Sequence, residues 1–139
     1  MRPTVRACVV ALLAAVALAA GGCGRRYPKV QGRVLLGGRP LRAGPGESAQ
    51  VIFLSTGTEH RSTPANCNGE DGTFTVAGVD GRGVPPGKYR VAVACYDADE
   101  RDRFNGAFGP NKSPLYCEVT DAKEQHVVID LDKKTVTAE

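Results

Sequence analysis

The residues of this chain that could carry out chemistry are its two histidines and a run of acidic side chains. His60 lies in a polar stretch and His126 begins an apolar run, and neither stands beside a serine or cysteine nucleophile motif. A catalytic triad can still assemble through a fold, because its members need not be neighbours in sequence. A hydrolase or metal-dependent enzyme that uses His60, His126 and the segment from Asp97 to Asp102 is therefore one hypothesis. The favoured hypothesis gives each histidine an exposed structural role.

The acidic run offers oxygen ligands of the kind that calcium prefers. It contains Asp97, Asp99, Glu100 and Asp102 in one short segment. The spacing does not match the twelve-residue calcium loop, with its fixed ligand positions, central glycine and terminal glutamate. Arginines between and after the acids also offset their charge. We therefore expect a solvated charged loop and no metal site.

The same acids begin a long segment that ends near Pro114 and contains Phe104 and Phe108. Long loops in compact domains often carry function. Asp97, Asp99 and the two phenylalanines are therefore candidate partner-binding residues, since exposed aromatic rings stack on sugars. The alternative is that both phenylalanines fix the loop to the body of the domain.

Three cysteines, Cys67, Cys95 and Cys117, belong to the folded part of the chain. An odd number allows at most one internal disulfide bond. Strand alternation points Cys95 and Cys117 to the same side, so they are the candidate pair. The alternative is that they are two small buried hydrophobic residues. Zinc is not expected, because no C-x-x-C motif is present and the histidines are distant in sequence.

The N-terminus has the pattern of a secretory signal peptide. Arg2 and Arg6 precede a small-apolar run over residues 7–20, followed by Gly-Gly-Cys23. A membrane-spanning helix needs roughly 20 apolar residues, so the run is too short to be one. The small residues before Cys23 resemble the lipobox of bacterial lipoproteins, with Ala20 where leucine is usual. This resemblance implies cleavage before Cys23 and acylation of its thiol, for example with palmitate. The alternatives are a plain secreted protein and an uncleaved anchor.

The expected mature chain is nearly neutral. Of the 18 basic side chains, Arg2 and Arg6 leave with the signal peptide, and 15 acidic ones remain to balance the others. No Lys/Arg cluster longer than a pair such as Arg25-Arg26 is present, so a nucleic-acid partner is not expected. The lipoprotein resemblance implies an extracytoplasmic, membrane-anchored protein. Gly24 favours the outer membrane, because an aspartate after the lipidated cysteine marks retention at the inner one.

The chain after residue 29 consists of short apolar runs separated by Gly, Pro, Asn and Asp, which is typical of an all-β sandwich. A short return is expected at Pro40-Leu41. Seven strands are predicted, over residues 29–36, 50–55, 65–68, 73–77, 88–96, 115–119 and 125–131. The predicted organisation is a signal peptide (1–22), a lipidated tether (23–29), a β-sandwich domain (30–132) and a frayed tail (133–139).

Three short motifs carry a second resemblance. They are the opening strand Val30–Val34 with the turn at residues 38–41, the hairpin Asp71-Gly72-Thr73-Phe74, and the strand start Pro86-Gly87-Lys88-Tyr89. Together they resemble prealbumin-like (transthyretin-like) and carboxypeptidase regulatory-like domains, which implies a seven-stranded Greek-key sandwich. The hydroxyisourate hydrolases of this group end in Tyr-Arg-Gly-Ser, whereas this chain ends in Val-Thr-Ala-Glu139. Their activity is therefore not expected here.

The sequence thus predicts a lipid-anchored β-sandwich module of the bacterial cell envelope that binds or scaffolds and is not an enzyme. Its expected partners are the membrane, through the lipid, and an envelope protein or glycan, with no cofactor. Phe53, Phe74, Tyr89 and Val91 are predicted to lie in the core, because they occupy the inward positions of apolar strands.

Overall fold

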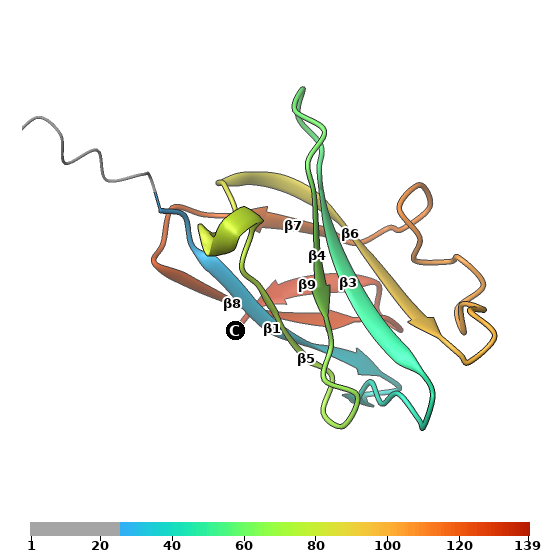
Figure 1. The fold of residues 1–139 in the computed structure, drawn as a ribbon. Helices are drawn as coiled ribbons and strands as arrows, with labels where there is room; N and C mark the ends of the chain where they lie inside the picture. Colours follow the sequence, from blue (N-terminus) through green and yellow to red (C-terminus); the bar gives the residue numbers. More distant parts are fainter. Residues whose placement is uncertain (1–25) are drawn as a thin grey trace, which may run out of the picture.

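The computed structural model describes residues 26–139, and the signal peptide, Cys23 and Gly24 lie outside this part. The described chain is all-β and forms two sheets (Figure 1). The strands are β1 (Lys29–Leu36), β2 (Arg39–Pro40), β3 (Ser48–Ser55), β4 (Ser62–Asn66), β5 (Thr73–Val76), β6 (Gly87–Tyr96), β7 (Tyr116–Val119), β8 (Glu124–Asp130) and β9 (Thr135–Ala138), with one 3-10 turn, η1 (Val79–Gly81). Between residues 26 and 139 no helix is long and apolar enough to cross a membrane.

The first sheet has β1 at its centre. Its strands follow the order β2-β1-β8-β9, and β5 also pairs with β1. The pairing of β1 with β8 is parallel and brings Gln31 opposite His126, whereas β5 runs antiparallel with Thr75 opposite Gln31. The second sheet has the order β4-β3-β6-β7, all antiparallel. The two sheets form the layers of a sandwich.

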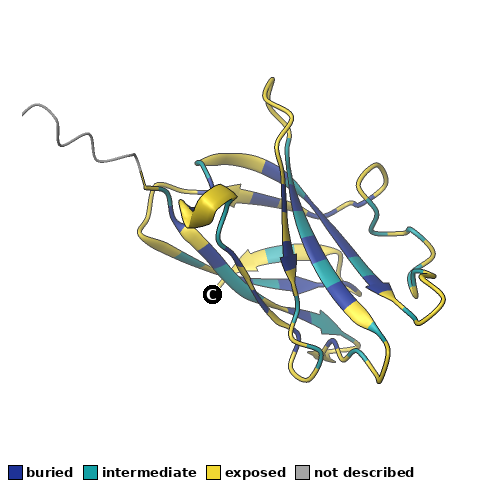
Figure 2. Ribbon diagram, viewed as in Figure 1, coloured by how far each residue is buried: buried dark blue, intermediate teal, exposed yellow. Residues whose placement is uncertain are grey.

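The core lies between the sheets, where inward residues alternate with outward ones along each strand (Figure 2). Phe53, Phe74, Tyr89 and Val91 are all buried, which confirms their predicted placement. The ring centroid of Phe53 lies 6.4 Å from that of Phe74 and 6.0 Å from that of Tyr89. Gly32 makes room for this cluster, because a Cβ atom there would lie 2.8 Å from the Phe74 ring.

The prediction of a frayed tail over residues 133–139 is wrong. Thr135–Ala138 forms β9, which pairs antiparallel with β8. The return turn is held by Asp130, whose Oδ1 accepts hydrogen bonds from the backbone N–H groups of Asp132 and Lys133. The chain therefore has nine strands in the described residues rather than the seven predicted. The additional strands, β2 and β9, are short and lie at sheet edges, where alternation of apolar residues is weak.

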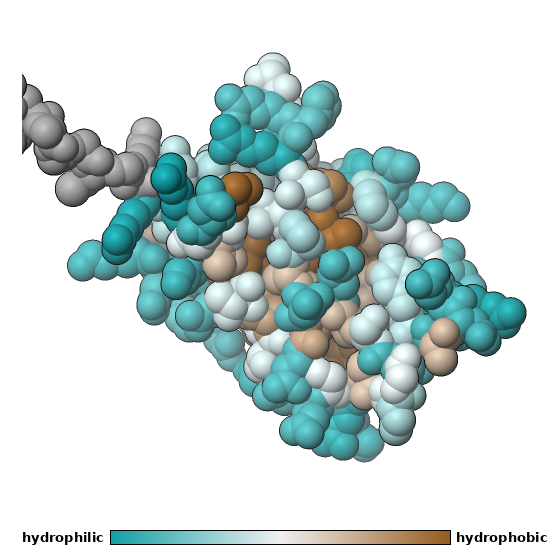
Figure 3. All heavy atoms as spheres, in the orientation of Figure 1, coloured by the Kyte–Doolittle hydropathy of each residue, from teal (hydrophilic) through white to brown (hydrophobic). Residues whose placement is uncertain are grey.

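The hairpin between β3 and β4 projects from one end of the sandwich, and its surface is hydrophilic (top of Figure 3). β4 begins at Ser62, directly after the tip of this hairpin. At the other end of β6 the chain enters the long loop, residues 97–115. This loop lies along the free edge of β6, where Leu115 O accepts from Val91 N and Phe108 O accepts from Val93 N, each at 2.9 Å.

Candidate functional site

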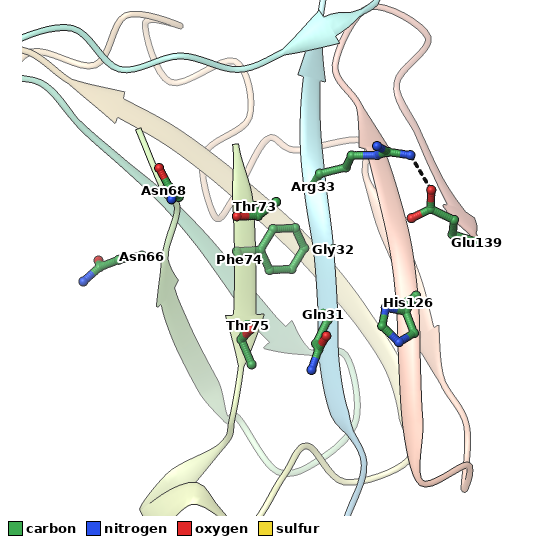
Figure 4. Close-up of a pocket in the computed structure, with 10 residues that line it drawn as sticks. All are labelled: Gln31, Gly32, Arg33, Asn66, Asn68, Thr73, Phe74, Thr75, His126 and Glu139. Carbon is green, nitrogen blue, oxygen red and sulfur yellow. Dashed lines mark hydrogen bonds and ion pairs between the residues drawn. The ribbon is translucent and has the colours of Figure 1, made fainter. Parts of the chain in front are cut away.

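The outer face of the first sheet carries a shallow groove of about 640 Å³ (Figure 4). Alternation along β1 turns Val30, Gly32 and Val34 inward, so Gln31 and Arg33 face outward. Register then aligns side chains across the sheet. Thr75, Gln31 and His126 form one row, and Thr73 stands beside Arg33 in the next.

One end of the groove is closed by an ion pair between Arg33 Nη2 and Glu139 Oε1. Glu139 reaches this position because β9 continues the sheet, and its backbone N–H donates to His126 O at 2.9 Å. Both side chains are about half exposed, at 47% and 48%, so the pair contributes little to stability but neutralises both charges. Asn66 and Asn68 line the opposite side, beyond β5 (Figure 4).

The chemistry of this polar groove is that of hydrogen bonding. Amides, hydroxyls and one imidazole line it, and its two formal charges pair with each other. His126 Nε2 lies 3.8 Å from Glu124 Oε2, which gives the ring a carboxylate neighbour. The Thr73 hydroxyl donates to Asp71 Oδ1 at 2.7 Å, so it is engaged in the hairpin turn rather than activated by the histidine. Such a lining suits hydroxyl and amide groups of a ligand.

The residues of the enzyme hypothesis do not come together. His126 is on the outer face of the first sheet, whereas His60 is in the β3–β4 hairpin of the second. The β3–β4 hairpin lies near the start of β6, where Ser55 pairs with Tyr89. Asp97 follows the far end of β6, where Ser48 pairs with Tyr96. At about 3.3 Å per residue, roughly 20 Å separates the two ends. No single pocket can therefore contain all three predicted elements.

The acids of the long loop hold its backbone. Asp102 Oδ1 accepts hydrogen bonds from Cys95 N and Phe104 N, and its Oδ2 accepts from Gly106 N at 2.8 Å. Asp97 Oδ1 accepts from the N–H groups of two following residues. Within residues 26–139, no three metal-binding side chains gather in a way that could hold an ion. The loop is therefore structured by its own carboxylates.

Phe104 and Phe108 contact each other edge to face, with ring centroids 5.6 Å apart. Both are half-buried and pack against the core cluster. Of the two alternatives given by the sequence, the structure matches the one in which these rings fix the loop to the sandwich. Asp97 and Asp99 lie nearby in the turn that begins the loop, with Asp99 exposed.

The predicted Cys95–Cys117 pair is wrong. Both side chains are buried, as strand alternation predicted, and both thiols are free. However, Cys117 stands opposite Tyr89 in the β6–β7 register, six residues from Cys95 along β6. The separation is roughly 20 Å, whereas a disulfide needs Cα atoms within about 7 Å. Alternation predicts which face of the sheet a side chain lies on. It does not predict which residue of the neighbouring strand stands opposite.

The third thiol, Cys67, is free and half-buried. Its N–H donates to Ala49 O, and Ala49 pairs with Cys95, so a complete strand separates the two cysteines. Burial raises the pKa of Cys67 to about 12, with a smaller contribution from Cys95. Burial likewise raises the pKa of Cys117 to about 11. Both are neutral thiols at physiological pH and poor nucleophiles.

Comparison of the chain with family models, with curated proteins and with solved structures finds no match. The candidate site therefore depends on geometry alone. Sequence reasoning did not bring the residues of the polar groove together into one site. The available signal was the outward alternation of polar residues, Gln31 with Arg33 and Thr73 with Thr75, on strands that pair with each other.

Proposed function

We propose that this protein is a lipid-anchored, extracytoplasmic β-sandwich of the bacterial envelope that binds a polar partner without catalysing a reaction. The observation that carries the proposal is the polar groove. Most of its side chains project from paired strands, which hold them in fixed positions, and apart from Phe74 and the Arg33–Glu139 pair they are amides, hydroxyls and one imidazole. The anchor is supported by the signal-like segment and Cys23 of the sequence.

A prealbumin-like Greek-key topology is part of this proposal. It is supported by two packed sheets and by the places of the sequence motifs, since the Asp71-Gly72 turn precedes β5 and Gly87 begins β6. Gly72 has φ +69° and a Cβ atom there would lie 2.8 Å from Val34 O. The turn therefore requires glycine for both backbone conformation and space.

The partner that best fits the groove is an envelope glycan. Hydroxyl groups both donate and accept hydrogen bonds, as do the amides of Gln31, Asn66 and Asn68 that line the groove. The groove is open rather than enclosed, which suits a polymer or a protein surface that extends beyond the site. An envelope protein is the second candidate partner, and its peptide groups would use the same donors and acceptors.

The test uses the full-length lipidated protein, solubilised in detergent and mixed with isolated insoluble cell-wall glycan. We expect the protein to sediment with the glycan. The double substitution Gln31→Ala and His126→Ala should weaken retention at least tenfold, because it removes side chains from the centre of the groove. Glu118→Ala, an exposed change on the outer face of the second sheet, is the matched control.

Equal retention of the groove variant and the control would contradict the proposed binding face. A second outcome would assign a protein partner instead. In that case the glycan retains none of the lipoprotein, while the wild type, but not the groove variant, captures a protein from the same envelopes. Release of soluble glycan fragments by the wild-type protein would contradict the non-catalytic part of the proposal, and mass spectrometry of the supernatant measures it.

A further inference from the structure

A second cavity, of about 460 Å³, lies on the outer face of the second sheet. Four separate segments meet there. They are the end of β3 at Leu54 and Ser55, the projecting β3–β4 hairpin with Ser62 at the start of β4, Arg90 of β6, and Pro110-Asn111 of the long loop. The hairpin side of this cavity belongs to the hydrophilic projection at the top of Figure 3.

The central group of this basic cavity is the Arg90 guanidinium. Its Nε and Nη2 donate to the Tyr116 hydroxyl at 3.2 and 2.8 Å, and its Nη1 donates to Pro110 O at 3.3 Å. The guanidinium carbon also lies 5.5 Å from the Tyr116 ring centroid. These contacts fix the planar group, yet they use only three of its five N–H donors. The other two N–H groups have a fixed direction and donate no hydrogen bond within residues 26–139.

The charge around Arg90 is positive. None of the residues that line the cavity, all of them in the described part of the chain, is acidic. Arg61 also lines it, but its guanidinium pairs with Glu59 at 2.6 Å, so its charge is offset. Lys88 also contacts the Tyr116 ring, with Nζ 5.5 Å from the ring centroid. No carboxylate of the described residues pairs with Arg90. His60 adds an imidazole to the lining of the cavity.

Neutral donors accompany the cation. Ser55 Oγ accepts a hydrogen bond from Gly57 N at 3.3 Å, which leaves its own O–H free to donate. Ser62 and Asn111 supply a further hydroxyl and an amide, and Leu54 and Pro110 form an apolar wall. A fixed arginine with hydroxyl and amide donors and no competing acid is the arrangement that recognises carboxylate and phosphate oxygens.

We propose that this basic cavity binds the phosphate or carboxylate group of a small anionic ligand, with Arg90 as the principal contact and Ser55 as an additional donor. The apolar wall would contact the neutral body of the ligand. The site is on the opposite sheet from the polar groove and does not depend on it, so either assignment can fail without the other.

The test is a titration of the full-length, detergent-solubilised protein with inorganic phosphate and, separately, with acetate at constant ionic strength. Nuclear magnetic resonance would follow the Arg90 Nε–H signal and the amide of Gly57. We expect saturable shifts of both signals, and the anion that saturates at lower concentration identifies the class of group. Arg90→Gln should raise the apparent Kd at least tenfold, whereas Arg90→Lys should raise it less.

Two further variants keep the test decisive if a change at Arg90 disturbs the fold. Ser55→Ala, at the end of β3, should raise the apparent Kd about threefold, while Arg39→Gln, on the exposed strand β2, should leave it unchanged. Shifts that do not saturate, shifts that chloride reproduces, or an apparent Kd from the Gly57 amide that is the same in the wild type, Ser55→Ala and the Arg90 variants would overturn the proposal.

Discussion

At the scale of single residues, the acids of the long loop are internal acceptors rather than ligands for an external ion. The sequence identified Asp102 as one of four crowded acids, and the structure directs both of its oxygens to backbone N–H groups. Sequence spacing cannot give this result, because it does not show which N–H groups converge on a carboxylate. The residue is structural, and its removal has a measurable cost.

Asp102→Ala should destabilise the protein by about 2–4 kcal/mol. It leaves three N–H groups without their acceptor, and hydrogen bonds to a charged group contribute about 1.5–3 kcal/mol each before partial rescue by water. Urea unfolding measures the change, and amide exchange should accelerate at Phe104 and Gly106. Asp99→Ala, an exposed change in the same loop, is the control and should cost less than about 0.5 kcal/mol. Equal costs for both would contradict the role of Asp102.

The buried thiols predict a loss of stability at high pH. In the unfolded chain Cys117 titrates near its ordinary value of 9.0, whereas burial raises its pKa to about 11 in the fold. Below pH 9 both states keep the proton. Above it the unfolded state releases the proton first, so stability falls as pH rises from about 9 to 11. Cys117→Ala should flatten the pH dependence of the unfolding free energy in this window, compared with the wild-type protein, and an unchanged slope would contradict the assignment.

At the scale of elements, the sequence predicted the long inward–outward strands well. Alternation placed one strand at residues 29–36, where β1 lies, and another at 88–96, where β6 begins one residue earlier. It failed for β9, because a short edge strand buries little and therefore has little apolar alternation. The polar groove was also not predicted, because it depends on β1 pairing with β5 and β8, and register is a tertiary property.

Truncation after Asp132 tests the strand that the sequence missed. It removes β9, its ladder with β8 and the half-buried Val136, so the free energy of unfolding should fall by roughly 2–4 kcal/mol at about 0.5–1.5 kcal/mol per hydrogen bond. Urea titration provides the measurement. Thr137→Ala, on an exposed position of β9, is the control for a change of side chain without loss of the strand. Unchanged stability on truncation would mean that the tail is frayed in solution.

Register also decides the state of the cysteines. A separation of roughly 20 Å along β6 excludes a bond between Cys95 and Cys117, and a complete strand separates Cys67 from Cys95. Alkylation of the native protein at pH 8 should label these three thiols slowly, because they are buried or half-buried. Alkylation in urea without a reductant should label all three, because none is in a disulfide. Mass spectrometry measures the labelling of each thiol under both conditions. A bridged peptide containing any two of them would contradict the observed strand register.

At the scale of the whole molecule, two surfaces on opposite sheets present different chemistry. The polar groove offers neutral hydrogen-bonding groups, and the basic cavity offers an arginine without a carboxylate partner. Both depend on a sandwich whose interior is filled by interlocking aromatic and β-branched residues. Because the rigid sheets fix the outward side chains, exposed positions can change with little effect on the core, which is why the groove and cavity variants are informative.

The attachment of this body to a membrane is a prediction from the sequence, since Cys23 lies outside the described residues. Each buried methylene contributes about 0.8 kcal/mol, and one acyl chain alone gives only marginal, reversible binding. Stable attachment through Cys23 therefore requires two or more chains. Cys23→Ser should leave an uncleaved precursor that lacks the lipid, while Cys95→Ser, a change at a buried thiol, should leave processing intact. Mass spectrometry of the N-terminal peptide measures both cleavage and acylation. An unmodified Cys23 at the mature N-terminus, or a Cys23→Ser protein processed like the wild type, would contradict the anchor and leave a secreted sandwich with the same two surfaces.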